Sequence, residues 1–315
     1  MTKLPADYVA PKEAISYADF PAATDAPAGM QTLDVSQEPT YPFVHLDVCY
    51  AYKAGLPLHL QIITPAIPSD DPDKTFPLIM WVQGSAFRKQ TVGYHLAQMT
   101  EVAKQGYVVA MVEYRWAPDN PFPAQVKDFH TATRYMLDHA NTYHVDPKHY
   151  IAWGDSSGGN TVTLGVTTAN DQAFNDEDVT VRPLHYQACI DFYGPTDISR
   201  MNKVPSGQNH VLPTSPEGEF MGRQNVYDVP ERVQQANPIT HIGDQQLPPF
   251  LIMHGDKDRT VPFEQSVLLY NALKAAHQEV AFYRIKNSDH STDAFFTPAA
   301  LNIVYDFLRQ SLNSK

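Results

Sequence analysis

The sequence predicts an α/β fold in which helices cover both faces of a mostly parallel β-sheet. Short apolar runs alternate with helix-like segments from residue 78 onward, and this alternation is typical of parallel strands joined by helices. The runs are also far enough apart for strand–helix units, each of which needs about thirty residues.

Each predicted element rests on its own stretch of sequence. Residues 43–64 hold two β-rich stretches on either side of Gly55, which predicts a hairpin. Six apolar runs then predict the strands 78–82, 107–112, 149–153, 185–192, 250–254 and 280–285. Helical candidates accompany the runs at residues 92–105, 124–141, 157–170, 264–277 and 298–311. The second candidate has a one-sided apolar stripe that includes Val126 and Phe129.

The length of 315 residues fits one large α/β domain or two smaller ones. Residues 1–42 are rich in Pro, Ala and acidic residues without periodicity, and we expect an extended N-terminal arm that wraps the surface. Residues 43–315 are then the α/β domain. Within it, residues 197–247 are Pro-rich and polar, which predicts a cap-like insertion over the sheet.

Composition excludes several classes of protein. A hydrophobic fraction of 43% indicates a folded core, and a formal net charge of -12 without a basic cluster argues against nucleic acid as a partner. Cys49 and Cys189 form no metal-binding pattern, so a reduced, cytoplasmic setting is expected, although one disulfide stays open. The first thirty residues lack an apolar signal segment and no run suits a membrane span, so no membrane partner is expected.

The stretch W-G-D-S-S-G-G-N at residues 153–160 follows an apolar run and precedes a helical pattern. A nucleophilic serine at a sharp strand-to-helix turn needs small residues two positions before and two after it. Ser156 has Gly154 and Gly158 there, whereas Ser157 has an aspartate two positions before it. We therefore predict Ser156 as a nucleophile. An ordinary Gly-rich turn is the alternative; a Walker phosphate loop is excluded because no G-K-[S/T] follows.

Backbone N–H groups are the predicted stabilisers of the oxyanion. Ser157 opens the following helix, and its N–H is expected to donate to the developing negative charge. The loop after the first of the six runs adds further donors, since Gly84 allows a turn and Ser85 and Ala86 carry N–H groups. The Ser157 hydroxyl receives no role, so Ser157→Ala is expected to be tolerated where Ser156→Ala is not.

A nucleophilic serine needs a general base, and the base needs an orienting carboxylate. In an arrangement of this type the chain order is Ser, acid, His. Asp258 follows the run 250–254 at the carboxyl end of a strand, where sites form in open α/β sheets, and Asp256 is the alternative acid. His290 follows the last run and is the predicted base. His254 ends a buried run and is interpreted as structural.

Four blocks of the sequence together resemble the α/β-hydrolase fold, and within it the esterase branch that contains acetyl esterases and bacterial feruloyl-esterase-like (BD-FAE-like) enzymes. The blocks are Q-G-S-A-F at 83–87, E-Y-R-W-A-P-D-N-P-F-P-A at 113–124, D-P-K-H-Y-I-A-W-G-D-S-S-G-G-N at 146–160, and H-G-D-K-D-R-T-V-P at 254–262 with Asp-His at 289–290. The resemblance implies a mostly parallel eight-stranded sheet with helices on both faces, a small irregular cap insertion, and no required metal or organic cofactor. It also implies Ser156 as nucleophile, His290 as base and Asp258 as acid.

The second block resembles the family's Y-R-x-A-P segment. It implies that Glu113, Tyr114 and Arg115 support the oxyanion loop, with a plain surface salt bridge as the alternative for Arg115. The chain departs from the family at Q-G-S-A, where related esterases often have H-G-G-G. Backbone donors survive this change, but the side chains narrow the acyl pocket. A similar Q-G-S-A-W form occurs in the feruloyl-esterase-like branch, which favours that substrate type.

These features predict a carboxylesterase that cleaves small acyl, acetyl or hydroxycinnamoyl esters through an acyl-enzyme, with a small-molecule ester as its partner. A peptidase of the prolyl-oligopeptidase type is one alternative, although 315 residues leave no room for a propeller domain. A catalytically silent binding protein is the other. Phe87, Trp116 and Phe122 either line a hydroxycinnamoyl pocket or belong to the core. The sequence leaves open the acyl and alcohol specificity and whether the chain forms a homo-oligomer.

Overall fold

The structure is a computed structural model that describes residues 4–11, 15–179 and 181–313. The chain separates into two compact units, Met1–Glu38 and Pro39–Lys315. The described residues of the first unit hold no helix or strand, and hydrogen bonds close isolated turns, such as that from Tyr8 N–H to the Pro5 carbonyl. That residues 1–42 wrap the surface stays a prediction. Parts of the predicted arm and domain lie outside the described residues: 1–3, 12–14, 180 and 314–315.

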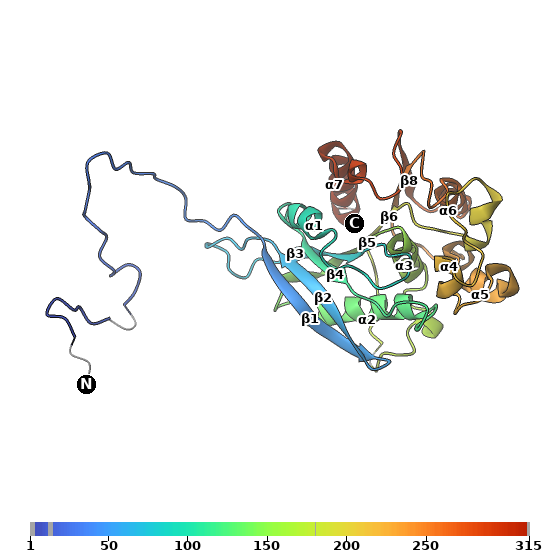
Figure 1. The fold of residues 1–315 in the computed structure, drawn as a ribbon, viewed down its shortest axis with the longest axis horizontal. Coiled ribbons are helices and arrows are strands. Elements are labelled where there is room, and N and C mark those ends of the chain that lie inside the picture. Colours follow the sequence, from blue (N-terminus) through green and yellow to red (C-terminus); the bar gives the residue numbers. More distant parts are fainter. Residues whose placement is uncertain (1–3, 12–14, 180, 314–315) are drawn as a thin grey trace. The chain divides into compact units, whose positions relative to one another are not determined.

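The second unit is built on one mostly parallel sheet, in which the described residues form eight strands (Figure 1). The strands are β1 Phe43–Lys53, β2 Leu56–Thr64, β3 Phe76–Val82, β4 Val108–Val112, β5 Val145–Asp155, β6 Ala188–Phe192, β7 Phe250–Gly255 and β8 Val280–Ile285. Their order is β1-β2-β4-β3-β5-β6-β7-β8, with β1 and β4 antiparallel to β2 and all other pairs parallel. The predicted hairpin and parallel sheet are confirmed.

Helices cover both faces of this sheet, as predicted. The longer ones are α1 Leu96–Ala103, α2 Ala124–Asp138, α3 Ser157–Thr167, α6 Glu264–Ala275 and α7 Pro298–Asn313, and two 3₁₀ helices are η1 Gln172–Phe174 and η5 Asp293–Phe296. Helices α2, α3 and α6 share an apolar cluster with Met80, whereas α1 and α7 share another with Trp81. These two neighbours on β3 enter different clusters because successive strand side chains face opposite sides. No helix in the described ranges is long and apolar enough to cross a membrane.

The position of the site follows from the strand order. The chain passes from β3 to β4 on one side of β3 and comes back to β5 on its other side. Where the strand order reverses, the segments that leave two neighbouring parallel strands diverge and open a crevice at their carboxyl ends. The predicted oxyanion loop follows β3 and the predicted nucleophile turn follows β5, so the two segments meet at this crevice.

Residues 197–247, predicted as an irregular insertion, form a series of short helices. These are η2 Ile198–Lys203, α4 Pro216–Phe220, η3 Val226–Asp228, α5 Pro230–Gln235 and η4 Pro238–His241. Most of them begin at a side chain that accepts a hydrogen bond from the first turn, namely Asp197, Ser215, Asn225 and Asn237. Each helix is too short to show a helical period in the sequence, so the pattern alone could not reveal them.

Helix α4 fastens the insertion to the loop after β3. Phe220 stacks on Phe87 with the ring centroids 3.8 Å apart, and it meets Phe122 edge-on at 5.5 Å. Arg88 Nε donates to the Glu219 carboxylate at 2.6 Å. Phe87 and Phe220 are each 1% exposed and share an apolar cluster with the insertion. The insertion and the loop after β3 are therefore packed as one body.

We expect Phe220→Ala to lower the free energy of unfolding by about 3–5 kcal/mol, because it removes a stacked ring and leaves a cavity. Urea denaturation followed by circular dichroism measures this change. The control is Tyr227→Ala in the same insertion, where the side chain is 51% exposed and the expected change is within about 0.5 kcal/mol. Equal effects of the two substitutions would contradict the packing described.

Candidate active site

Ser156 occupies the single position between the end of β5 and the start of α3. Its backbone has φ 50° and ψ -126°, outside the regions that L-residues favour. The Ser156 N–H donates to the Phe192 carbonyl at the end of β6 at 2.8 Å, which helps to hold the turn. This is the strained strand-to-helix geometry that presents a serine hydroxyl above a sheet.

The glycines on either side of Ser156 are required by close backbone contacts. A Cβ on residue 154 would lie 2.5 Å from the Gly158 carbonyl oxygen, and a Cβ on residue 158 would lie 2.0 Å from the Val82 carbonyl oxygen. Both separations are far below van der Waals contact. The requirement for small residues at Gly154 and Gly158 therefore has a direct steric cause.

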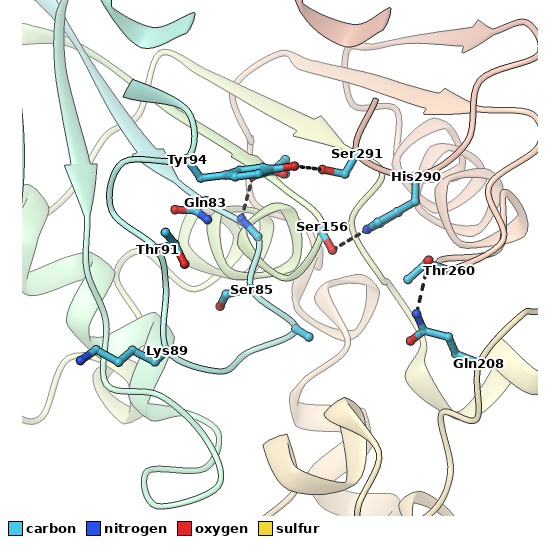
Figure 2. A pocket seen from close by; sticks show the side chains of 13 residues that line it. Gln83, Ser85, Lys89, Thr91, Tyr94, Ser156, Gln208, Thr260, His290 and Ser291 are labelled. Atoms are coloured by element: carbon cyan, nitrogen blue, oxygen red, sulfur yellow. Dashed lines mark hydrogen bonds between the residues drawn. The ribbon is translucent and has the colours of Figure 1, made fainter. Parts of the chain in front are cut away.

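Three predicted residues meet at the carboxyl ends of the strands. His290 Nε2 lies 2.9 Å from Ser156 Oγ (Figure 2). On the other side of the ring, His290 Nδ1 lies 2.7 Å from Asp258 Oδ2. A carboxylate only accepts hydrogen bonds, so Nδ1 carries a proton, and in the neutral ring Nε2 is free to accept the serine proton. The alternative acid, Asp256, instead accepts the Asn287 N–H at 2.6 Å. The structure therefore brings His290 to Asp258.

Asp258 is held by four hydrogen-bond donors. Its Oδ1 accepts the N–H groups of Thr260 and Val261, each at 2.8 Å, and its Oδ2 contacts His254 Nε2 at 3.1 Å as well as His290. Burial raises the pKa of this carboxyl, but the hydrogen bonds from His254 and His290 outweigh burial and lower the pKa to about 2. His254, interpreted from the sequence only as structural, is fully buried and also contacts the acid.

The loop after β3 differs from the prediction at Ser85. The Ser85 N–H donates to Ser157 Oγ at 2.9 Å, so it is occupied, and its assignment as an oxyanion donor is wrong in this structure. Gly84 N–H donates to Asp155 Oδ1 at 2.7 Å. Among the described residues nothing accepts from the Ala86 N–H, and Ala86 lines the cavity in front of Ser156. The sequence also missed the contact of the Ser157 hydroxyl, because it joins residues 72 positions apart.

Behind this loop, Tyr114 and Arg115 of the predicted supports are buried, Glu113 is partly buried, and all three are hydrogen-bonded. Arg115 is 8% exposed and binds Asp128 through Nε and Nη2. The alternative of a plain surface salt bridge is therefore wrong. Glu113 accepts hydrogen bonds from the backbone N–H of His59 at 3.1 Å and contacts the His59 ring at 2.9 Å. Tyr114, which lies between Glu113 and Arg115 in the sequence, is 1% exposed.

Tyr193 at the end of β6 is a residue of the site that the sequence did not reveal. Its ring centroid lies 4.8 Å from that of His290, and its hydroxyl donates to Asp155 Oδ2 at 3.2 Å. Burial raises the pKa of Asp155, although the Gly84 N–H and the Tyr193 hydroxyl oppose that change. Tyr193 thus packs against the imidazole and also holds the carboxyl group that anchors the loop after β3.

A cavity of about 420 Å³ lies in front of Ser156 and His290. Most of the other residues that line it carry a hydroxyl, amide or ammonium group, among them Gln83, Lys89, Thr91, Tyr94, Gln208, Thr260 and Ser291 (Figure 2). Phe87 and Phe122 belong to the apolar core and do not line it, and neither does Trp116, so these aromatic rings form no hydroxycinnamoyl pocket. In the described part of the chain, no group of three His, Cys, Asp or Glu side chains is placed to hold a metal ion.

The sheet, its helices and the strained serine turn define the chain as an α/β-hydrolase fold, as the resemblance implied. Residues 62–273 match the model of the BD-FAE family. That match covers more than half of the sequence, and the chain belongs to this family.

Its relatives include named esterases. Esterase LipQ of Mycobacterium tuberculosis is 27% identical over 252 residues, which cover 76% of this chain and 57% of LipQ. Probable carboxylic ester hydrolase LipM of the same organism is 27% identical over 254 residues, which cover 78% of this chain and 56% of LipM. This chain thus spans little more than half the length of these relatives. A solved truncated carbohydrate esterase from gut microbiota superposes with a TM-score of 0.74 at 25% identity, over 88% of this chain and 99% of that chain.

The Asp258 hydrogen bonds predict a pH-dependent contribution to stability. The folded-state pKa of about 2 lies below the unfolded value of about 3.9, so the stabilisation is fully present above the unfolded pKa and is lost as pH falls through the folded pKa. We expect the difference in free energy of unfolding between the wild type and Asp258→Asn to shrink as pH falls from about 6 to about 3. Urea denaturation across this range measures it, and a pH-independent difference would contradict it.

The buried Arg115 guanidinium predicts a large effect of removing its carboxylate partner. The Asp128 side chain is fully buried, with Arg115 Nη2 at 2.8 Å, so Asp128→Ala should cost about 3–5 kcal/mol of unfolding free energy. The matched control is Asp119→Ala, because Asp119 is 73% exposed with its arginine partner 3.7 Å away, and should cost less than about 1 kcal/mol. Thermal and urea unfolding of both variants test the contrast.

Proposed function

We propose that this protein hydrolyses carboxylic esters, with Ser156 as nucleophile, His290 as general base and Asp258 as the acid that orients it. The observation that carries the proposal is the continuous contact from Ser156 Oγ through the imidazole to Asp258 Oδ2, at 2.9 and 2.7 Å. Membership of the BD-FAE family and the esterase relatives support the same class of reaction.

The reaction begins when Ser156 Oγ attacks the ester carbonyl carbon as its proton passes to His290 Nε2. Asp258 stabilises the resulting imidazolium and keeps Nδ1–H pointed at its own carboxylate. The carbonyl electron pair moves onto oxygen, and the Ala86 and Ser157 N–H groups bind this oxyanion. The intermediate collapses as the imidazolium protonates the leaving alcohol, which leaves an acyl-enzyme. Water then repeats the sequence, releases the carboxylic acid and restores Ser156.

Esters with a small acyl group on a polar alcohol suit the cavity best. Its hydroxyl- and amide-rich wall can pair with hydroxyl groups of an alcohol, and one structural relative is named a carbohydrate esterase. A panel of acetyl, butyryl, octanoyl and feruloyl esters tests the acyl preference predicted from the sequence. The cavity favours the shorter members, since the predicted aromatic residues are absent from its wall.

Ser156→Ala should abolish hydrolysis of p-nitrophenyl acetate while the protein remains folded, because no other group forms the acyl-enzyme. The control is Ser311→Ala, which removes a buried helix hydroxyl whose one hydrogen bond among the described residues goes to the Phe307 carbonyl. It should retain wild-type turnover. Turnover by Ser156→Ala above the rate in buffer would disprove the proposed mechanism.

Two further assays distinguish an active esterase from the two alternatives, a catalytically silent binding protein and a peptidase. Labelling of the wild type by a fluorophosphonate, lost in Ser156→Ala, distinguishes an active hydrolase from a silent binding protein. Parallel acyl-linked and aminoacyl-linked chromogenic substrates distinguish an esterase from a peptidase, and faster cleavage of the acyl ester supports the proposal.

We also propose that the protein works in the cytoplasm, as expected from the sequence. Cys49 and Cys189 are both free thiols, one exposed and one buried, so they form no disulfide with each other. Free thiols are typical of reducing compartments.

A further inference from the structure

The hydroxyl groups of Ser85, Tyr114 and Ser157 form a hydrogen-bonded circuit beneath the loop after β3. Ser85 Oγ donates to the Arg88 carbonyl at 2.6 Å and lies 2.8 Å from the Tyr114 hydroxyl. Ser157 Oγ receives the Ser85 N–H at 2.9 Å and lies 3.4 Å from the same Tyr114 hydroxyl. The three side chains come from the loop after β3, the segment after β4 and the first residue of α3.

The direction of each hydrogen bond follows from the number of protons available. Each hydroxyl has one proton to donate. Ser85 uses its proton on the Arg88 carbonyl, so Tyr114 is the donor to Ser85 Oγ. Tyr114 Oη then has only acceptor capacity left for Ser157, so the Ser157 hydroxyl donates to it. The circuit therefore runs from Ser85 N–H to Ser157, to Tyr114 and back to Ser85, and every hydroxyl both accepts and donates.

We propose that the Ser157 hydroxyl is a positioning residue for ester hydrolysis: it draws the Ser85 N–H down toward α3 and so leaves the Ala86 N–H as the loop's donor to the oxyanion. Ala86 and Phe87 have φ values of 56° and 60°, a left-handed conformation that L-residues adopt only when their surroundings impose it. The Ser85–Ser157 hydrogen bond holds this conformation on the N-terminal side of Ala86. The Phe87–Phe220 stack holds it on the C-terminal side of Ala86.

Because the circuit is buried, water cannot readily replace a hydrogen bond that is removed from it. Ser157 is 2% and Tyr114 is 1% exposed, so water has little access to a donor left without its acceptor, and such a donor is costly. Burial also raises the pKa of Tyr114 to about 12, which keeps its hydroxyl protonated as the circuit requires. Gln90 fixes Tyr114 independently, since it accepts the Tyr114 N–H at 3.0 Å and donates to the Gln83 carbonyl at 3.2 Å.

The test compares Ser157→Ala with Ser311→Ala, two buried serines at helical positions. Ser157→Ala keeps its backbone N–H and loses only the hydroxyl. We expect kcat for p-nitrophenyl acetate to fall by about 10- to 100-fold, less than the full loss of an oxyanion donor, with KM changed less than about threefold. The inhibition constant of phenylboronic acid, which forms a tetrahedral adduct on Ser156, should rise by the same factor as kcat/KM falls. Ser311→Ala should change none of these.

A double-mutant cycle with Tyr114→Phe tests the circuit itself. Tyr114→Phe should lower kcat with the same signature, and its effect should shrink in the Ser157→Ala background, because the circuit is already open there. Additive effects would overturn the proposal, and so would a kcat of folded Ser157→Ala within twofold of Ser311→Ala. If Ser157→Ala does not fold, judged by circular dichroism, the kcat and phenylboronic acid values of Tyr114→Phe decide the question alone.

This inference rests on the proposed function, and the two can fail separately. Turnover by Ser156→Ala would remove the proposed function. An inactive Ser156→Ala together with a fully active Ser157→Ala would leave the proposed function in place and remove only the role of the Ser157 hydroxyl.

Discussion

Direct backbone contact between the first turn of α3 and the end of β3 is the constraint on which the site depends. Gly158 lies so close to the Val82 carbonyl that a single added carbon would be 2.0 Å from its oxygen. This approach forces Ser156 into its strained turn and places Ser157 within reach of Ser85. The serine, the loop after β3 and the hydroxyl circuit are therefore positioned by the same contact. A side chain at this contact would displace all three together.

Two carboxyl groups near the serine show how surroundings decide the charge of one residue type. Asp258 accepts two backbone N–H groups and contacts two imidazoles, and its pKa falls to about 2 despite burial. Asp155 is also buried, but burial outweighs its fewer donors and its pKa rises. The first group can thus remain ionised beside an imidazolium. The second serves by anchoring Gly84 and Tyr193.

Much of the fold was predictable because parallel strands, buried on both faces, appear as continuous apolar runs in the sequence. Ser156, Asp258 and His290 could be selected because each follows such a run at the same edge of the sheet. Contacts between side chains distant in sequence were not predictable. The Ser85–Ser157 bond and the Tyr193–His290 packing depend on tertiary distances that no local pattern encodes. The short helices of residues 197–247 were missed for another reason, because each is too short to show a helical period.

The packing of α4 on the loop after β3 also bears on how such proteins diversify. Phe220 and Glu219 hold Phe87 and Arg88, the two residues that follow the proposed oxyanion donor Ala86. Residues 197–247, of which Gln208 lines the cavity, are thus not an interchangeable module. A chimera that received a foreign segment 197–247 would need partners for Phe87 and Arg88 as well as a new cavity wall. A change of substrate specificity through this segment would therefore also affect the catalytic rate. Directed evolution of such a chimera would have to select for both properties together.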